Sequence, residues 1–186
     1  MNSPILSLLG NEASHSINGL KGVAYYMAGF MNGCIRVGIF PTQLKDDGTS
    51  HRTSFFDVQQ VIFGVHKILP VPMLVPSIFN FGDEVRCVIN GFKGIVTCIT
   101  YGMDGRVEVG ISPTILHNGS PIPEEGFDIN QCEIIKKTET DYPNPFKSYV
   151  LSSVNCPWIV KDSSIPDATG GPQHDSFIER RFLNRK

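Results

Sequence analysis

Short runs of alternating apolar and polar residues predict β-strands, most clearly in the second half of the chain. Alternation at Val85–Ile89 predicts a first strand. A turn at Asn90-Gly91 separates it from Gly94–Tyr101, which is rich in Ile, Val and Thr and predicts a second. The dipeptide Asp104-Gly105 predicts a tight hairpin turn, and Arg106–Ser112 is the returning strand.

After a polar, Pro-rich loop, a closing segment at Phe127–Ile135 completes this unit. It begins with the pattern Phe-Asp-x-x-Gln, which we interpret as a short 3₁₀ turn before a last strand. Four or five short strands within about 55 residues bury one face by curling into a barrel. The pattern therefore predicts an all-β fold.

The same unit occurs earlier in the chain. Without gaps, residues 9–44 match residues 81–116 at 15 of 36 positions, whereas composition alone predicts about two or three. Phe56–Phe63 then corresponds to the closing segment at an offset of 71. The chain therefore contains two copies of one unit, residues 9–64 (module 1) and residues 81–137 (module 2).

The two copies differ most in their opening strand. Module 1 has Ala13-Ser14-His15-Ser16 where module 2 has Val85-Arg86-Cys87-Val88, so most of the apolar alternation is lost. We expect this strand to be a sheet edge, completed by the other module or by another subunit.

Three motifs of module 2 indicate a fold family. They are Gly-Asp-x-Val at residues 82–85, Gly-Phe-Lys-Gly-Ile-Val at 91–96 and Gly-Arg-Val-x-Val at 105–109. This series resembles the SH3-like barrels of the KOW type, over residues 82–111 well and over 10–39 less well. Small tailed-phage modules with Gly-Phe-Lys-Gly and Phe-Asp-x-x-Gln are similar. The resemblance implies two tandem SH3-like small barrels, and it implies no partner.

Three segments lie outside the modules. Residues 1–8 form an N-terminal apolar arm that we expect to dock nearby, and residues 65–80 form a Pro-rich apolar connector, expected to lie across the barrels as a strap. Residues 138–186 read as an extended C-terminal arm with anchors for a partner or for its own barrels. These anchors are Tyr142, Phe146, Trp158, Phe177, Arg180, Arg181 and Phe182.

The charge balance argues against general nucleic-acid binding. The formal net charge is -2, and module 2 holds five Lys or Arg against eight Asp or Glu. The chain has no apolar run long enough to span a membrane, and its start lacks the basic region of a secretory signal. We expect a soluble protein made in a cytoplasm.

Neither the cysteines nor the histidines form a recognisable site. The five cysteines show no C-x-x-C pair and do not recur between the modules, which favours buried free thiols. The five histidines lack metal-ligand spacing, which favours solvated surface positions. With no nucleophile elbow or phosphate loop, we expect no enzyme activity, catalytic residue, metal or cofactor.

Two charged residues recur in both modules. Lys21 and Lys93 occupy the same Gly-x-Lys-Gly turn, where the lysine either keeps the turn soluble or contacts nucleic acid or another anion. Asp57 and Asp128 each follow a Phe, and we favour backbone capping over an acid–base pair.

The phenylalanines that precede these carboxylates, Phe56 and Phe127, also recur. We expect them to plug the core rather than to form a stacking platform.

These features predict a non-enzymatic structural or interaction protein of a large assembly. The specific hypothesis is a tailed-phage virion component, such as a capsid decoration or head-associated protein, made in the host cytoplasm and held in many copies by protein partners. One alternative is a KOW-like nucleic-acid or ribonucleoprotein binder that uses Lys21, Lys93, Arg86 and Arg106. Another is a small-molecule-sequestering protein with a pocket between the barrels. We expect function to lie in the arm and in what differs between the modules.

Overall fold

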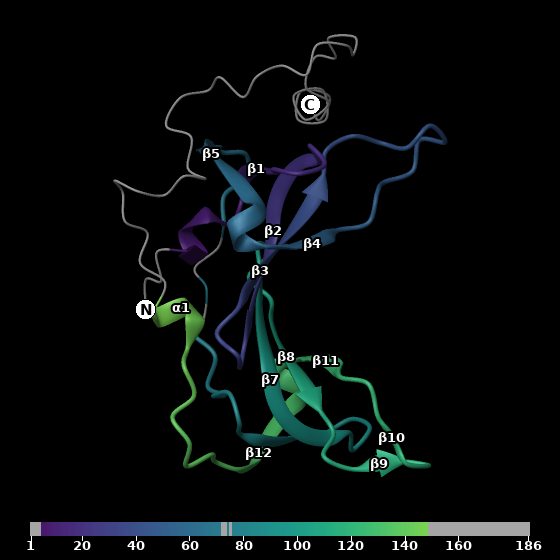
Figure 1. The fold of residues 1–186 in the computed structure, drawn as a ribbon, viewed down its shortest axis with the longest axis vertical. Helices are drawn as coiled ribbons and strands as arrows, with labels where there is room; N and C mark the ends of the chain where they lie inside the picture. The colour runs from purple at the N-terminus through teal and green to yellow at the C-terminus, as the bar shows by residue number, and fades with distance from the viewer. Residues whose placement is uncertain (1–4, 72–73, 75, 149–186) are drawn as a thin grey trace, which may run out of the picture.

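The computed structural model describes residues 5–71, 74 and 76–148 (Figure 1). Antiparallel strands dominate these residues, with one short α-helix, α1 (Pro145–Ser148), near their end. The all-β prediction is therefore confirmed.

Module 1 folds as an antiparallel meander. Its strands are arranged β4-β3-β2-β1-β5, and neighbours in this order are hydrogen-bonded. Their bounds are β1 (Asn11–His15), β2 (Lys21–Phe30), β3 (Ile35–Pro41), β4 (Ser54–Asp57) and β5 (Val61–Lys67).

Module 2 repeats this arrangement as β11-β8-β7-β6-β12. A hairpin of two short strands, β9 and β10, interrupts the loop before β11. The bounds are β6 (Glu84–Cys87), β7 (Lys93–Gly102), β8 (Val107–Ser112), β9 (Leu116–His117), β10 (Ser120–Pro121), β11 (Glu125–Asp128) and β12 (Cys132–Lys136).

Equivalent local features shape the two modules. The Phe-Asp-x-x-Gln segments form the predicted 3₁₀ turns, η2 (Val58–Gln60) and η3 (Ile129–Gln131), each followed by the last strand. The long strands carry bulges at equivalent places, between Ala24 and Tyr26 in β2 and between Val96 and Cys98 in β7. A bulge increases local twist, so each long strand can serve both its module and the junction between modules.

The modules join edge to edge through their longest strands. Tyr26–Phe30 of β2 pairs with Cys98–Gly102 of β7, which gives one ten-stranded sheet. We call this pairing the seam. Figure 1 shows module 1 above module 2, with the seam between them.

The prediction of two tandem closed barrels is not confirmed. In the described residues β4 pairs with β3 alone and β11 with β8 alone, so the sheet is open. Both edge strands are four residues long, and the following 3₁₀ turn carries the chain away before further pairing.

The prediction for the opening strand of module 1 is wrong. β1 is no edge, because it lies between β2 and β5 and pairs with both. Ala13 and His15 are buried at the inner positions that Val85 and Cys87 take in module 2. The small Ala13 side chain and the flat His15 ring therefore fill these inner positions, although β1 lacks the apolar alternation of β6.

One hydrophobic core runs through both modules and takes in segments outside them. Ile5 and Leu9 are fully buried, with Ile5 in the short helix η1 (Ile5–Leu8). In the connector, Phe79 is buried and the backbone N–H of Ser77 donates to the Tyr101 hydroxyl over 3.2 Å. The N-terminal segment and the connector therefore pack on the sheet, as their apolar composition suggests.

Candidate interaction surface

A cluster of four aromatic side chains lies on the face of module 1 that points away from the core. The ring centroids of Tyr25 and Tyr26 are 4.7 Å apart, Tyr25 and Phe40 5.9 Å, and Tyr26 and Phe55 6.0 Å. Phe55 is 47% exposed and Phe40 37% exposed, and both tyrosines are half-buried. We call these four residues the aromatic surface.

Two glycines form the floor under this surface. A Cβ atom on Gly38 would stand 3.0 Å from the Tyr26 Cβ and 3.1 Å from the Phe55 Cε1. A Cβ atom on Gly102, across the seam, would stand 3.3 Å from the Tyr26 Cε1. Because these positions lack side chains, there is room for the Tyr26 side chain beside β3 and β7.

Module 2 has no such surface. Thr97, Cys98 and Ser112 stand where module 1 has Tyr25, Tyr26 and Phe40, and Gly126 stands where it has Phe55. Over Gly110, the counterpart of Gly38, lies the Glu124 carboxylate, which is hydrogen-bonded to the Thr97 hydroxyl. The aromatic surface is therefore not required by the shared scaffold.

Charged groups of module 2 border the aromatic surface across the seam. Burial raises the pKa of the Tyr26 hydroxyl, and Tyr25 and the carboxylates of Asp104 and Glu108 raise it further, against a smaller opposing effect of Arg106. The hydroxyl therefore stays protonated at neutral pH. The surface combines large apolar rings with a hydrogen-bond donor and neighbouring carboxylates.

The aromatic surface is hard to predict from sequence because its side chains come from different strands that lie side by side only in the fold. A difference between the two modules nevertheless indicates it. The predicted site residues did not include any of the four rings. An alignment of the copies shows three large aromatic residues replaced by Thr, Cys and Ser, a difference that core packing does not explain.

The two recurring lysines are not brought together. Lys21 begins β2 and Lys93 begins β7, and the seam lies near the other end of both strands, so the lysines sit at opposite ends of the sheet. The Lys93 ammonium lies 2.9 Å from the Glu84 carboxylate.

The arginines proposed for nucleic-acid binding are paired with carboxylates. The Arg86 Nε donates to the Glu133 carboxylate over 2.8 Å. The Arg106 guanidinium lies 3.4 Å from Glu108 and 3.8 Å from Asp104. This pairing offsets the positive charge that a phosphate backbone requires.

The described part of the C-terminal arm packs on the chain's own sheet. Phe146 is 4% exposed and meets Tyr101 edge to face, with the ring centroids 5.1 Å apart. The Tyr142 ring lies against Gly82, where an added Cβ would stand 2.4 Å from its Cε2. The other predicted anchors, Trp158, Phe177, Arg180, Arg181 and Phe182, lie outside the described residues.

The capping prediction is confirmed for one aspartate and wrong for the other. Asp128 accepts a hydrogen bond from the Asn130 backbone N–H over 2.8 Å. Asp57 makes no side-chain cap, and its carboxylate instead lies 3.4 Å from the Arg36 Nε. Module 2 has Glu108 at the place of Arg36, so the Asp128 carboxylate has no cation opposite it on β8.

Phe56 and Phe127 lie at the margin of the core. Both are partly buried and packed against it. Phe56 stacks on His15 at 3.9 Å, and Phe127 lies 5.3 Å from Phe92.

That stack corrects the prediction for His15, which is 7% exposed rather than solvated. Its Nδ1 lies 2.8 Å from the Asn18 Oδ1, and its Nε2 is buried with no hydrogen-bond partner among the described residues. The prediction of exposure holds for His51 and His117.

The cysteines are free thiols, as predicted, at every described position. Cys87 and Cys98 are buried and Cys132 is half-buried, but Cys34 is exposed. The prediction of burial is wrong for Cys34 because it follows the Asn32-Gly33 hairpin turn, where its N–H donates to the Asn32 Oδ1.

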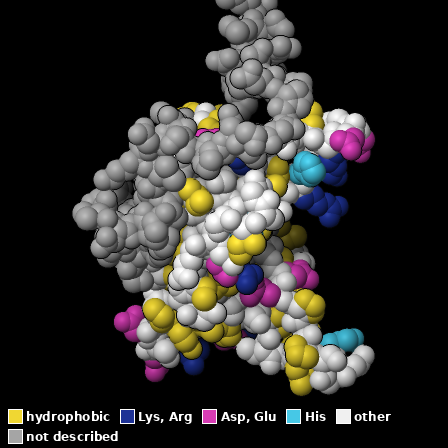
Figure 2. Space-filling model, turned by 45° about the horizontal axis from the view of Figure 1, so that its top comes forward, with side chains coloured by type: hydrophobic (Ala, Val, Ile, Leu, Met, Phe, Trp, Pro, Cys, Tyr) yellow, Lys and Arg dark blue, Asp and Glu magenta, His cyan; other side chains and the backbone are white. Residues whose placement is uncertain are grey.

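Further apolar side chains are exposed at the ends of the modules. Ile17 and Ile89 precede the recurring Asn-Gly turns and are 74% and 71% exposed. Ile115 and Leu116 are exposed at the start of the β9–β10 hairpin, which we call the module 2 tip. Figure 2 shows hydrophobic side chains next to a histidine at the lower right, on this tip. The equivalent loop of module 1, between β3 and β4, carries four charged side chains and one histidine among its twelve residues, and side chains of these kinds are seen at the upper right of Figure 2.

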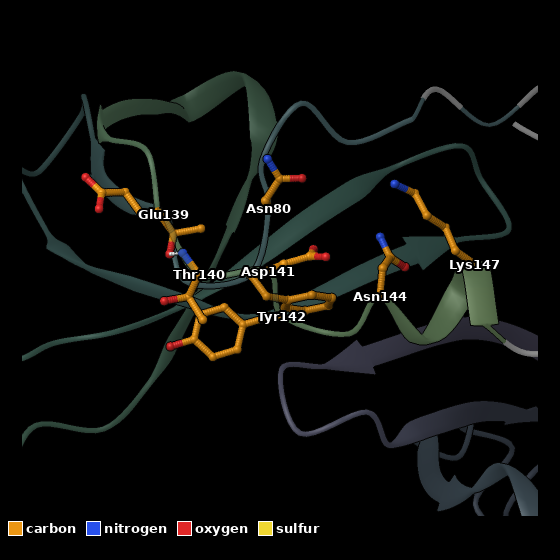
Figure 3. Close-up of a pocket in the computed structure, with 9 residues that line it drawn as sticks. Asn80, Glu139, Thr140, Asp141, Tyr142, Asn144 and Lys147 are labelled. Carbon is orange, nitrogen blue, oxygen red and sulfur yellow. Dashed lines mark hydrogen bonds between the residues drawn. The ribbon is translucent and has the colours of Figure 1, made fainter.

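One polar pocket lies away from the aromatic surface. Its side chains come from the end of the connector and from the chain after β12, as Figure 3 shows. Its volume is about 290 Å³. Small-molecule sites are usually lined by apolar side chains, whereas this pocket is lined by Asn80, Phe81, Thr138, Glu139, Thr140, Asp141, Tyr142, Asn144 and Lys147.

Comparison with known protein families, with curated proteins and with solved structures gives no match to this chain. Within residues 5–71, 74 and 76–148, no three His, Cys, Asp or Glu side chains gather in a way that could hold a metal ion. Across the same residues, no helix is both long and apolar enough to cross a membrane.

Proposed function

We propose that this chain is a non-enzymatic interaction protein of a large assembly, built from two SH3-like modules joined through the seam. The assembly we propose is the virion of a tailed phage, in which the chain is a capsid decoration or another head-associated protein. This assignment rests on the motif resemblance and on the chemistry of the surface.

The observation that carries the proposal is the aromatic surface. Two exposed phenylalanines beside two tyrosines form an apolar patch that water solvates poorly, and such patches mark protein contacts. Module 2 folds the same scaffold without it. A requirement of the fold therefore does not account for it, whereas a partner does.

The same geometry favours a protein partner over nucleic acid. Arg86, Lys93 and Arg106 are each paired with a carboxylate, and the groups that border the aromatic surface include Asp104 and Glu108. A phosphate backbone would be repelled by these carboxylates. A polypeptide with apolar and basic side chains would complement them.

The test compares incorporation into purified particles between the wild-type chain and the double variant Phe40→Ser/Phe55→Ser. We expect the variant to remain folded, because both side chains are partly exposed. Its amount in purified phage particles should be at least tenfold lower than that of the wild-type chain. The matched control is Ile115→Ser, which removes another exposed apolar side chain, on the module 2 tip, and should be incorporated normally. Equal incorporation of wild type and double variant, or absence of the wild-type chain from particles, contradicts the proposal.

A further inference from the structure

Cys87 and Cys132 lie directly opposite each other in the pairing of β6 with β12. In an antiparallel pair, residues that face each other point to the same side of the sheet. Here that side is the core, because Cys87 is fully buried and Cys132 packs against the core cluster. The two thiols are free and adjacent.

The hydrogen-bond pattern places this pair at the closer of the two spacings found in antiparallel sheets. The backbone N–H of Val88 donates to the Gln131 carbonyl over 2.8 Å, so the hydrogen-bonded pairs flank the cysteine pair. Residues in such a non-hydrogen-bonded pair have Cα atoms about 4.5 Å apart. A disulfide needs a Cα separation of roughly 4.4–6.8 Å.

A second contact holds the strands in this register. Arg86 and Glu133, the next pair along, form an ion pair on the opposite, solvent-facing side. In module 1 the equivalent strands carry His15 opposite Val61, so no disulfide is available there. The cysteine pair is a feature of module 2 alone.

We propose that Cys87 and Cys132 are an oxidation site, and that they form a disulfide joining β6 to β12 when the protein leaves a reducing compartment. The inference goes beyond the proposed function, because it does not depend on what binds the aromatic surface. Reducing cytoplasm keeps thiols free, whereas an oxidising exterior permits disulfides. The bond would close a long loop and so stabilise module 2.

The oxidant is a small-molecule disulfide such as oxidised glutathione. The thiolate of Cys132, the more accessible thiol, attacks one glutathione sulfur, forms a mixed disulfide and expels one glutathione thiolate. The Cys87 thiolate then attacks the Cys132 sulfur and expels the second. Two protein thiols are oxidised, one glutathione disulfide is reduced to two thiols, and the two protons pass to the glutathione thiolates.

The reaction is slow at neutral pH for a structural reason. Burial, and to a smaller extent Cys87 and Asp128, raise the pKa of the Cys132 thiol to about 11. The thiolate is the nucleophile, so its scarcity keeps the reduced form long-lived.

The test is a peptide map of the full chain after incubation with oxidised glutathione, alkylation of free thiols and digestion with trypsin without reduction. Cleavage after Arg86, Lys93, Arg106 and Lys136 places Cys87, Cys98 and Cys132 on three separate peptides. We expect peptides 87–93 and 107–136 to be recovered as one linked species. Recovery of both as alkylated peptides, or linkage of either to the Cys98 peptide, overturns the proposal.

A stability measurement accompanies the map. Oxidation should raise the melting temperature by about 5 °C or more, since a disulfide across a long loop is a substantial constraint on the unfolded chain. Cys132→Ser should abolish the shift, whereas Cys34→Ser, which removes an exposed thiol, should retain it. If Cys132→Ser does not fold, the wild-type peptide map decides alone.

Discussion

Ala28 lies directly opposite Thr100 at the centre of the seam, and the two residues are equivalent positions of the repeat. The flanking pairs obey the same relation, because Tyr26 faces Gly102 and Phe30 faces Cys98, their equivalents in reverse order. Two bonds complete the symmetry: the N–H of Met31 donates to the Thr97 carbonyl and that of Met103 to the Tyr25 carbonyl, each over 2.8 Å. The backbone pairing at the seam therefore has a local pseudo-two-fold axis between Ala28 and Thr100.

This axis gives the duplication a physical meaning. A two-fold contact is self-complementary, so a single ancestral module could have paired with its own copy through the same strand. When both copies stand in one chain, positions outside the seam can differ between them while the strand pairing is kept. The aromatic surface on module 1 and the cysteine pair in module 2 are differences of this kind.

The first prediction concerns Asp83, a fully buried carboxylate at the entry to module 2. It accepts hydrogen bonds from the N–H groups of Asn80 and Thr138, both over 2.9 Å, and lies 3.6 Å from the Lys137 ammonium. Asp83→Asn should lower the free energy of unfolding by about 2 kcal/mol. An amide has one acceptor oxygen, so its NH2 group would face one of the two backbone N–H donors and leave that donor without an acceptor.

Urea denaturation at pH 7 measures this loss. The control, Glu139→Gln, makes the same chemical change at an exposed carboxylate nearby and should alter stability by less than about 0.5 kcal/mol. Equal effects of the two substitutions would contradict the assigned role of Asp83.

The second prediction concerns Phe146, which ties the start of the C-terminal arm to the seam. An added Cβ on Gly29 would stand 2.6 Å from the Phe146 Cε2, so the ring rests directly on β2. Phe146→Ala should cost about 3 kcal/mol of stability through the cavity that it leaves. Phe55→Ala, the same change at a half-exposed ring, should cost less than about 1 kcal/mol, and chemical denaturation distinguishes the two.

Local chemistry made much of module 2 predictable from sequence. Its strands alternate apolar residues, Asp104-Gly105 sets the hairpin, and Phe127-Asp128 opens the 3₁₀ turn, so each element follows from a few neighbouring residues. The burial of β1 did not follow, because Ala13 and His15 gain their places from β2 and β5 on either side.

The candidate site was harder to predict, for a related reason. Tyr25, Tyr26, Phe40 and Phe55 come from three strands and from a bulge whose position the sequence does not mark. The same holds for Asp57, whose carboxylate turns to Arg36 because β3 places a cation opposite it. Pairing across strands, rather than propensity within them, decides both.

The third prediction concerns thiol reactivity. Burial raises the pKa of the Cys98 thiol to about 11, so below that pH it is mostly protonated and unreactive. At pH 8 iodoacetamide should label exposed Cys34 rapidly and Cys98 slowly, and the Cys98 rate should rise about tenfold per pH unit up to pH 10. Mass spectrometry of the tryptic peptides measures both rates. After urea denaturation the two thiols should be labelled at comparable rates. Comparable rates in the folded protein at pH 8 would contradict the burial of Cys98.

The last prediction tests the two-fold axis with a fragment of residues 76–141, which contains module 2 without Phe146. Removing module 1 exposes the β7 edge, and the seam geometry makes that edge complementary to itself, with Thr100 facing Thr100 of a second copy. We expect the fragment to be a dimer by light scattering.

Thr100→Lys should convert the dimeric fragment to a monomer, because two like charges would then face each other. In the full chain the substituted residue would face the small, uncharged Ala28 instead of a second lysine, so the stability of the full chain should be unchanged. A folded monomeric wild-type fragment would show that the seam needs features particular to β2, and the symmetry of the backbone would then not extend to the energetics of the contact.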